Sequence, residues 1–129
     1  MNLYSPRSRE SFFSHLAQAK LIIIDNCSTT LLYALSFNIP TILFWNKSHF
    51  IFRDEAKSYL EELERVGIYY HSPEAAAIMV NNIIDDPYGW WNSCDIQAVR
   101  KNFCDNFIRI SPNYLQEWHN LLLNLHEYI

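Results

Sequence analysis

The residues best suited to binding or catalysis lie in one polar segment, residues 25–30, between an aliphatic run and a helical pattern. The segment reads Asp25, Asn26, Cys27, Ser28, Thr29 and Thr30. A helix N-terminus presents unpaired backbone N–H groups and a partial positive charge, and hydroxyl side chains there can add hydrogen bonds to phosphate oxygens. The segment is therefore a candidate phosphate site. The alternative is a simple helix cap, in which Ser28 or Thr29 satisfies only the helix backbone, and spacing alone slightly favours that alternative.

Two further segments are candidates for the same site. Trp45 and Asn46 follow a second apolar run, where an aromatic ring and an amide could stack on and hydrogen-bond a nucleotide base, or only shape a loop. Arg53 opens the next helical pattern and could pair with a phosphate, although solvated first-turn arginines are more common. The adjacent Trp90 and Trp91 resemble an aromatic clamp, but at least one of two neighbouring tryptophans is expected to pack on the helices.

Histidine and cysteine spacing predicts neither a metal site nor a nucleophilic centre. The five histidines lie far apart, and the three cysteines include no CxxC pair. We therefore expect no metal, no cofactor, and reduced thiols rather than disulfides. No catalytic residue is identified, because Cys27 beside a helix N-terminus would have a lowered pKa in principle but no base can be placed next to it.

Alternating helical and strand patterns position these segments. Continuous apolar runs predict buried parallel strands at residues 21–24 and 41–45, and residues 68–70 form a third short strand pattern. Gly67 stands where a helix ends, and Ser72, Pro73 and Glu74 have the order typical of a helix start. Helices are expected at residues 8–20, 31–35, 53–66, 74–84, 95–108 and 113–128, with a break at 85–89.

Strands that alternate with helices through short loops require a parallel sheet with right-handed crossovers. We expect an α/β fold: a three-layer, Rossmann-like half domain whose short parallel sheet of about three strands is flanked by helices, followed by two C-terminal helices. Residues 1–129 form one domain, and residues 94–129 form a helical pair that packs on it. Ligands of open α/β sheets bind at the carboxyl ends of the strands, which is where residues 25–30 and 45–46 fall.

Composition limits the classes of function. The chain has 129 residues, half of them hydrophobic, which suits one domain with a sufficient core. Because the chain has only 2 glycines, a glycine-rich phosphate loop is excluded, and its net charge of −4 argues against nucleic-acid binding. No apolar run approaches the ~20 residues of a membrane span. The N-terminal residues lack a signal-peptide pattern, so we expect a cytoplasmic protein.

Several motifs together resemble the C-terminal nucleotide-binding domain of GT-B-type transferases, and most closely a family of bacterial transferases of surface-carbohydrate biosynthesis. CDP-glycerol glycerophosphotransferases and UDP-N-acetylglucosamine 2-epimerases are more distantly similar. The resemblance covers nearly the whole chain, and its family-specific parts are the segment around Trp90 and the terminal Ser-Pro…Trp pattern. Its residues are Asp25-x-x-Ser28-Thr29-Thr30, Asn38-x-Pro40-Thr41-Ile42, Asp86-Pro87-x-Gly89-Trp90-Trp91-Asn92, Arg100-x-x-Phe103 and Ser111-Pro112-x-x-Leu115-x-x-Trp118.

The resemblance implies that Ser28, Thr29 and Thr30 contact the phosphates of a nucleotide-activated sugar or alditol donor and that Asp25 lies at the base of the cleft. The chain departs from the family in two ways. Tyr33 stands where the family often has an acid in a Leu-Glu-Ala-Leu pattern, and a phenol cannot act as a bidentate acceptor. The acceptor-binding lobe of a two-lobed transferase is also missing, so we expect a truncated piece, a split gene product or a stand-alone remnant.

Two functions follow from these observations. The first is the donor-binding part of a glycosyl- or glycerophosphotransferase-like enzyme of surface polysaccharide biosynthesis, incomplete without an N-terminal lobe. The alternative is a non-catalytic interaction module derived from that fold, which would cover an exposed apolar patch by homodimerisation. An epimerase-like enzyme is a weaker third option, because the paired acids that it needs are not identified.

Overall fold

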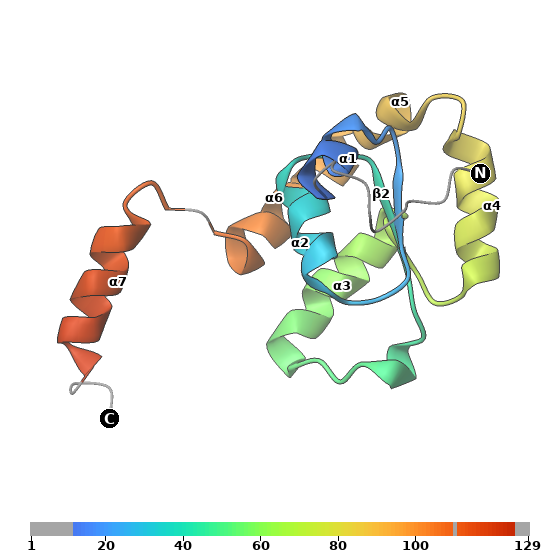
Figure 1. Ribbon diagram of the computed structural model, residues 1–129. Coiled ribbons are helices and arrows are strands. Elements are labelled where there is room, and N and C mark those ends of the chain that lie inside the picture. Colours follow the sequence, from blue (N-terminus) through green and yellow to red (C-terminus); the bar gives the residue numbers. More distant parts are fainter. Residues whose placement is uncertain (1–11, 110, 126–129) are drawn as a thin grey trace.

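A computed structural model describes residues 12–109 and 111–125 of the chain. Helices and strands alternate along most of it (Figure 1). The elements are α1 (Phe12–Gln18), β1 (Ile22–Ile24), α2 (Thr29–Ser36), β2 (Thr41–Phe44), the 3₁₀ helix η1 (Lys47–His49), α3 (Asp54–Arg65), β3 (Tyr69–Tyr70), α4 (Pro73–Ile83), α5 (Pro87–Trp91), α6 (Cys94–Phe107) and α7 (Tyr114–Leu123).

The three strands form a parallel sheet in the order β1-β2-β3. Ile23 lies opposite Ile42, and Leu43 opposite Tyr69. Figure 1 shows α4 on one side of β2 and α2, α3 and α6 on the other. The expected α/β architecture, with a short parallel sheet between layers of helices, is therefore confirmed.

The two faces of β2 are covered by different helices. Leu43 belongs to the main core, which joins the sheet to side chains of α2, α3 and α6. Ile42 points the other way and packs against Ala76 and Ile83 of α4. Both strand residues are fully buried, as a continuous apolar run predicts, whereas Ile23 of the edge strand β1 is 52% exposed. The prediction that the first strand is buried on both faces is thus wrong, because no described helix covers this residue.

Local signals explain most element boundaries. Ser72 caps α4 by accepting a hydrogen bond from the backbone N–H of Ala75, and Pro73 takes the first helical position. Gly67 follows α3 with a φ of 80°, a conformation that suits glycine. The first four residues of the helix expected at 8–20 lie outside the described residues. The sequence prediction missed α5 and η1, which occupy segments read as a break and a loop.

A chain of hydrogen bonds ties α2, α5 and α6 together. The fully buried Trp91 donates from Nε1 to the Asn38 side chain at 2.8 Å, and its carbonyl accepts from Gln97 at 2.9 Å. Gln97 in turn accepts from Arg100, whose guanidinium also donates to the carbonyl of Leu35 at the end of α2. Trp91 therefore packs in the core, as expected for one of the two tryptophans, and the Asn38, Trp91 and Arg100 motifs hold the helices in place.

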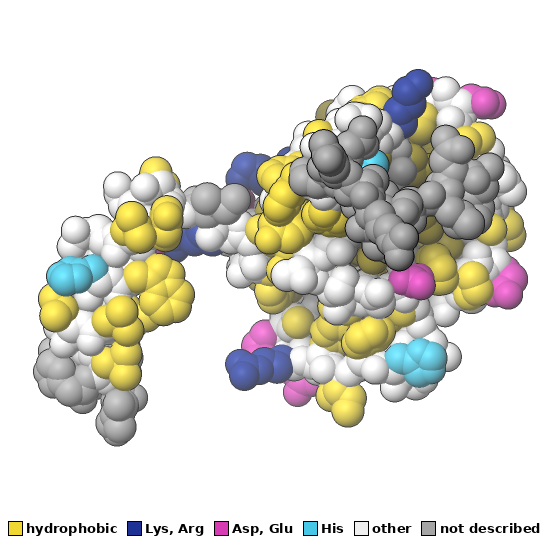
Figure 2. Space-filling view, in the orientation of Figure 1, with side chains coloured by type: hydrophobic (Ala, Val, Ile, Leu, Met, Phe, Trp, Pro, Cys, Tyr) yellow, Lys and Arg dark blue, Asp and Glu magenta, His cyan; other side chains and the backbone are white. Residues whose placement is uncertain are grey.

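The two C-terminal helices differ in their packing. α6 contacts α2 and α3 and buries Ile96, Val99 and Phe103. α7 has no buried residue, and Figures 1 and 2 show it extending away from the rest of the chain. Of the helical pair expected to pack on the domain, the structure thus places α6 against it and leaves all of α7 exposed.

Candidate site at the carboxyl edge of the sheet

The carboxyl ends of the three parallel strands lie at one edge of the sheet. β1 ends at Ile24 and leads into residues 25–28, and β2 ends at Phe44 and leads into Trp45 and Asn46. His71 directly follows β3. The polar segments selected from the sequence therefore share the edge where ligands of open α/β sheets bind.

Ser28 occupies the N-cap position of α2 without acting as a side-chain cap. Its backbone is extended, with φ −128° and ψ 177°, and its carbonyl accepts from the backbone N–H of Leu31 at 3.1 Å. Its hydroxyl makes no capping hydrogen bond. Ser28 and Thr29 are exposed and Thr30 is partly buried. The simple cap that spacing favoured is thus not formed by Ser28, and its hydroxyl is available to a ligand at the helix N-terminus.

Asp25 and Asn26 lie beside this helix start and contact each other. The Asn26 side-chain amide donates to the Asp25 carboxylate at 3.1 Å, and both residues are exposed. Because a carboxylate repels a phosphate, Asp25 suits a hydroxyl group of a ligand better than a phosphate oxygen.

A mostly apolar pocket of about 270 Å³ opens next to Ser28 and Thr29. Cys27 lines the same side, and the other walls come from α2, α3, α6 and Phe52. Burial raises the pKa of the Cys27 thiol, which corrects the expectation that the helix N-terminus would lower this pKa. Cys27 therefore contributes a neutral, poorly nucleophilic wall. The apolar lining residues are Leu31, Leu32, Phe52, Ala56, Leu60, Phe103 and Phe107.

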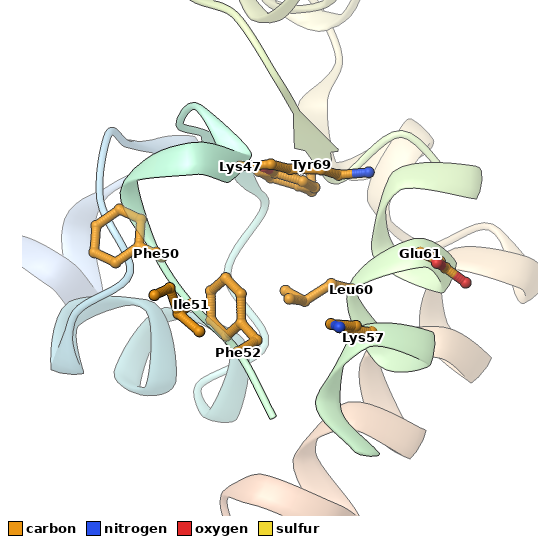
Figure 3. Close-up of a pocket in the computed structure, with 8 residues that line it drawn as sticks. All are labelled: Lys47, Phe50, Ile51, Phe52, Lys57, Leu60, Glu61 and Tyr69. Atoms are coloured by element: carbon orange, nitrogen blue, oxygen red, sulfur yellow. The ribbon is translucent and has the colours of Figure 1, made fainter. Parts of the chain in front are cut away.

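A second pocket, of about 250 Å³, adjoins the first through Phe52 and Leu60, which line both (Figure 3). Figure 3 shows Leu60 pointing from α3 toward Phe52, whereas Glu61 points away from the space between them. Lys47, Lys57 and Tyr69 complete the lining together with Phe50 and Ile51. The carboxyl edge of the sheet thus has two connected hollows, one bordered by hydroxyl groups and the other by lysines.

Of the remaining predicted site residues, Trp45 and Asn46 have structural roles, whereas Arg53 is exposed. Trp45 is only 4% exposed, and its ring packs against Tyr69 at a centroid distance of 4.5 Å, so it is not open for stacking on a base. Asn46 caps η1 by accepting from the Ser48 backbone N–H at 2.9 Å and from the Ser48 hydroxyl at 2.8 Å. Arg53 is exposed at the N-cap position of α3, next to Phe52 of both pockets.

Sequence reasoning missed a polar network behind the second pocket. Glu64 accepts from Lys47 Nζ at 3.2 Å and from His71 Nε2 at 2.7 Å. His71 Nδ1 lies 3.1 Å from the Tyr69 hydroxyl, which donates to the carbonyl of Trp45 at 2.9 Å. Burial, followed by the nearby negative charge of Glu64, raises the pKa of Tyr69 to about 12. The members come from separate elements, so no local spacing pattern could have indicated them.

Tyr33, which stands where the family often has an acidic residue, lies away from these pockets. It is 39% exposed and packs edge-on against Phe13 of α1 at a centroid distance of 5.2 Å, and it also stacks with Phe37. It lines neither pocket. The side chain at this position therefore belongs to an aromatic surface on α1 and α2 in this chain.

A family model described as LIC12162 family transferase matches residues 3–122. This match includes both pockets and nearly all of α7. The chain belongs to the LIC12162 family of transferases. Membership confirms the transferase part of the resemblance. No curated protein and no solved structure matches the chain, and in the described part of this LIC12162 chain no helix is long and apolar enough to cross a membrane.

Proposed function

We propose that this chain binds the nucleotide-activated donor of a transferase reaction, with the donor phosphates at the N-terminus of α2. The observation that supports this most directly is the Ser28 hydroxyl, which stands at a helix N-terminus and makes no capping hydrogen bond. Backbone N–H groups at such a terminus attract anions, and Ser28 and Thr29 add two hydroxyl donors beside a pocket.

The pocket beside Ser28 suits the less polar part of such a donor. Its walls are aliphatic and aromatic, and its volume of about 270 Å³ is near the lower limit of common ligand pockets. A base or a sugar ring would fit against Phe52 and Phe103, while the phosphates remain at the polar rim. Arg53 is an exposed cation that directly follows Phe52 of this wall, and we propose that it pairs with a donor phosphate.

The donor class rests on the resemblance and not on family membership. Family membership supports a transferase role. The resemblance alone favours a nucleotide-activated sugar or a CDP-alditol used in surface polysaccharide biosynthesis as the donor. We propose that the protein acts in the cytoplasm, where such donors are available. We assign donor binding alone to these residues, and no catalytic group, because no described nucleophile or base faces the Ser28 pocket with a suitable pKa.

Isothermal titration calorimetry with UDP- and CDP-linked sugars and alditols tests the site. We expect the double variant Ser28→Ala/Thr29→Ala to weaken binding by about 10- to 100-fold, since it removes two hydrogen bonds to a charged group. Ser58→Ala, an exposed serine on α3 outside both pockets, is the matched control and should bind like the unmodified chain. If no nucleotide binds to the folded chain, the site assignment fails.

A further inference from the structure

Two exposed apolar surfaces of this chain have no partner among the described residues. The first, here called the α7 stripe, consists of six side chains that are 41% to 70% exposed: Tyr114, Leu115, Trp118, Leu121, Leu122 and Leu125. Five of them belong to α7, where spacings of three and four residues place them on one side of the helix, and Leu125 follows just after its end. Gln116, His119 and Asn120 lie on the other side together with Leu123, which is 62% exposed, so most but not all apolar residues of α7 share one face.

The second surface, here called the aromatic patch, lies on α1 and α2. It consists of Phe12, Phe13, Tyr33 and Phe37, which are 39% to 53% exposed. Their rings contact one another at centroid distances between 5.2 and 6.4 Å. A contiguous cluster of this kind is unusual on a surface that meets only water and is typical of a binding surface.

We propose that the chain forms a symmetric dimer in which the α7 stripe of each protomer packs on the aromatic patch of the other. Figure 2 shows hydrophobic side chains on the face of α7 that is turned toward the rest of the chain, with an open space between them. A second copy can enter this space with its own α7. Each protomer then uses both of these surfaces, and the two-fold arrangement closes with two protomers.

The area available matches what a stable dimer needs. A half-exposed aromatic or leucine side chain still offers on the order of 100 Å² to a partner. The α7 stripe and the aromatic patch together therefore offer at most about 1,000 Å² per protomer, or about 2,000 Å² over both protomers. Specific interfaces bury roughly 1,200–2,000 Å² over both partners. A helix of 10 residues is also marginal in water by itself, so α7 gains its stability from whatever covers its apolar side.

Light scattering of the full chain over a micromolar concentration range tests the dimer. We expect twice the mass of the chain, and we expect Trp118→Glu to raise the dissociation constant by about 100-fold or more, because a charge would be buried without a partner. Phe37→Glu should have the same effect from the other surface, and at 53% exposure it leaves the core unchanged. Gln116→Glu, on the polar side of α7, is the matched control and should remain dimeric.

Mixing the two variants identifies which surfaces meet. Trp118→Glu retains an intact patch and Phe37→Glu an intact α7, so an equal mixture should form a mixed dimer with one of its two contacts, whereas neither variant dimerises alone. The proposal is overturned if the unmodified chain is monomeric at every concentration. It is also overturned if the dimer survives either variant. Survival of Phe37→Glu alone would indicate that α7 of one protomer pairs with α7 of the other.

Discussion

At the scale of single residues, glycine at position 89 leaves space for the carboxylate of Asp86, and no unusual backbone conformation explains it. Asp86 caps α5 by accepting from the Gly89 backbone N–H at 2.9 Å. A Cβ at position 89 would lie 2.1 Å from Asp86 Oδ2, a distance that two unbonded atoms do not adopt. The Asp86-Pro87-x-Gly89 motif is therefore a compact helix start that places the buried Trp91 one turn later.

We expect Gly89→Ala to lower the free energy of unfolding by about 1–2 kcal/mol, since the capping carboxylate must move away. In an Asp86→Ala background the same substitution should be neutral or stabilising by up to about 1 kcal/mol, because alanine is the better helix former once the carboxylate is gone. Urea denaturation of the two single variants and the double variant measures this coupling. Additive effects would contradict the proposed steric cause.

The residue scale also separates what the sequence could reveal from what it could not. Asp86 followed by Pro87 is the usual order of a cap and first helical position, so α5 was detectable from local signals that were read as a helix break. The buried strand predicted at 41–45 implied that Trp45 is buried, but its packing against Tyr69 was not detectable, because Tyr69 comes from a different strand. The Glu64 interactions with Lys47 and His71 have the same origin in tertiary structure.

At the scale of elements, hydrophobic periodicity predicted helix and strand positions well. The predicted strand at 41–45 and helix at 53–66 lie within one residue of β2 and α3 at each end. Both predictions rest on local patterns that do not depend on distant contacts. The helix predicted at 113–128 contains α7, but an amphipathic pattern could not indicate which surface covers its apolar side, because it states only that one side avoids water.

The junction between α2 and β2 depends on Asn38, which links the two elements to α5. Asn38 has a φ of 56° and accepts from Trp91 Nε1 through its side chain at 2.8 Å. We expect Asn38→Gly to lower the free energy of unfolding by about 1 kcal/mol, because it keeps the backbone conformation and loses one hydrogen bond. Asn38→Ala should cost about 2 kcal/mol, since it also strains the backbone.

Urea denaturation distinguishes these two contributions at Asn38. Asn92→Ala, an exposed residue at the end of α5, serves as a control whose stability should change by less than about 0.5 kcal/mol. Equal losses for the glycine and alanine variants would mean that the left-handed backbone of Asn38 stores no strain. No loss for either variant would contradict a structural role for the bond to Trp91.

At the scale of the whole molecule, stability is concentrated in the sheet and its helical layers. Ile42 and Leu43 of β2 are fully buried, whereas α7 has only exposed residues. Backbone amides exchange with solvent through local opening where few apolar contacts oppose it, and through global unfolding in the core. The two parts of the chain should therefore respond differently when protein concentration changes.

Hydrogen–deuterium exchange measured at several protein concentrations can follow this difference. At low concentration, where the chain is monomeric, we expect the α7 amides to exchange at rates close to those of an unstructured peptide, because an uncovered helix of 10 residues is marginal in water. As dimers form, α7 protection should rise by mass action, while protection of β2 rises only as far as association stabilises the folded chain as a whole. Strong α7 protection at the lowest concentration would instead mean that the helix folds back on its own domain. In that case the extended arrangement of α7 and the proposed dimer, in which each α7 packs on the other protomer, would both be wrong. The proposed phosphate site at Ser28 would be unaffected, since neither the α7 stripe nor the aromatic patch lines the Ser28 pocket.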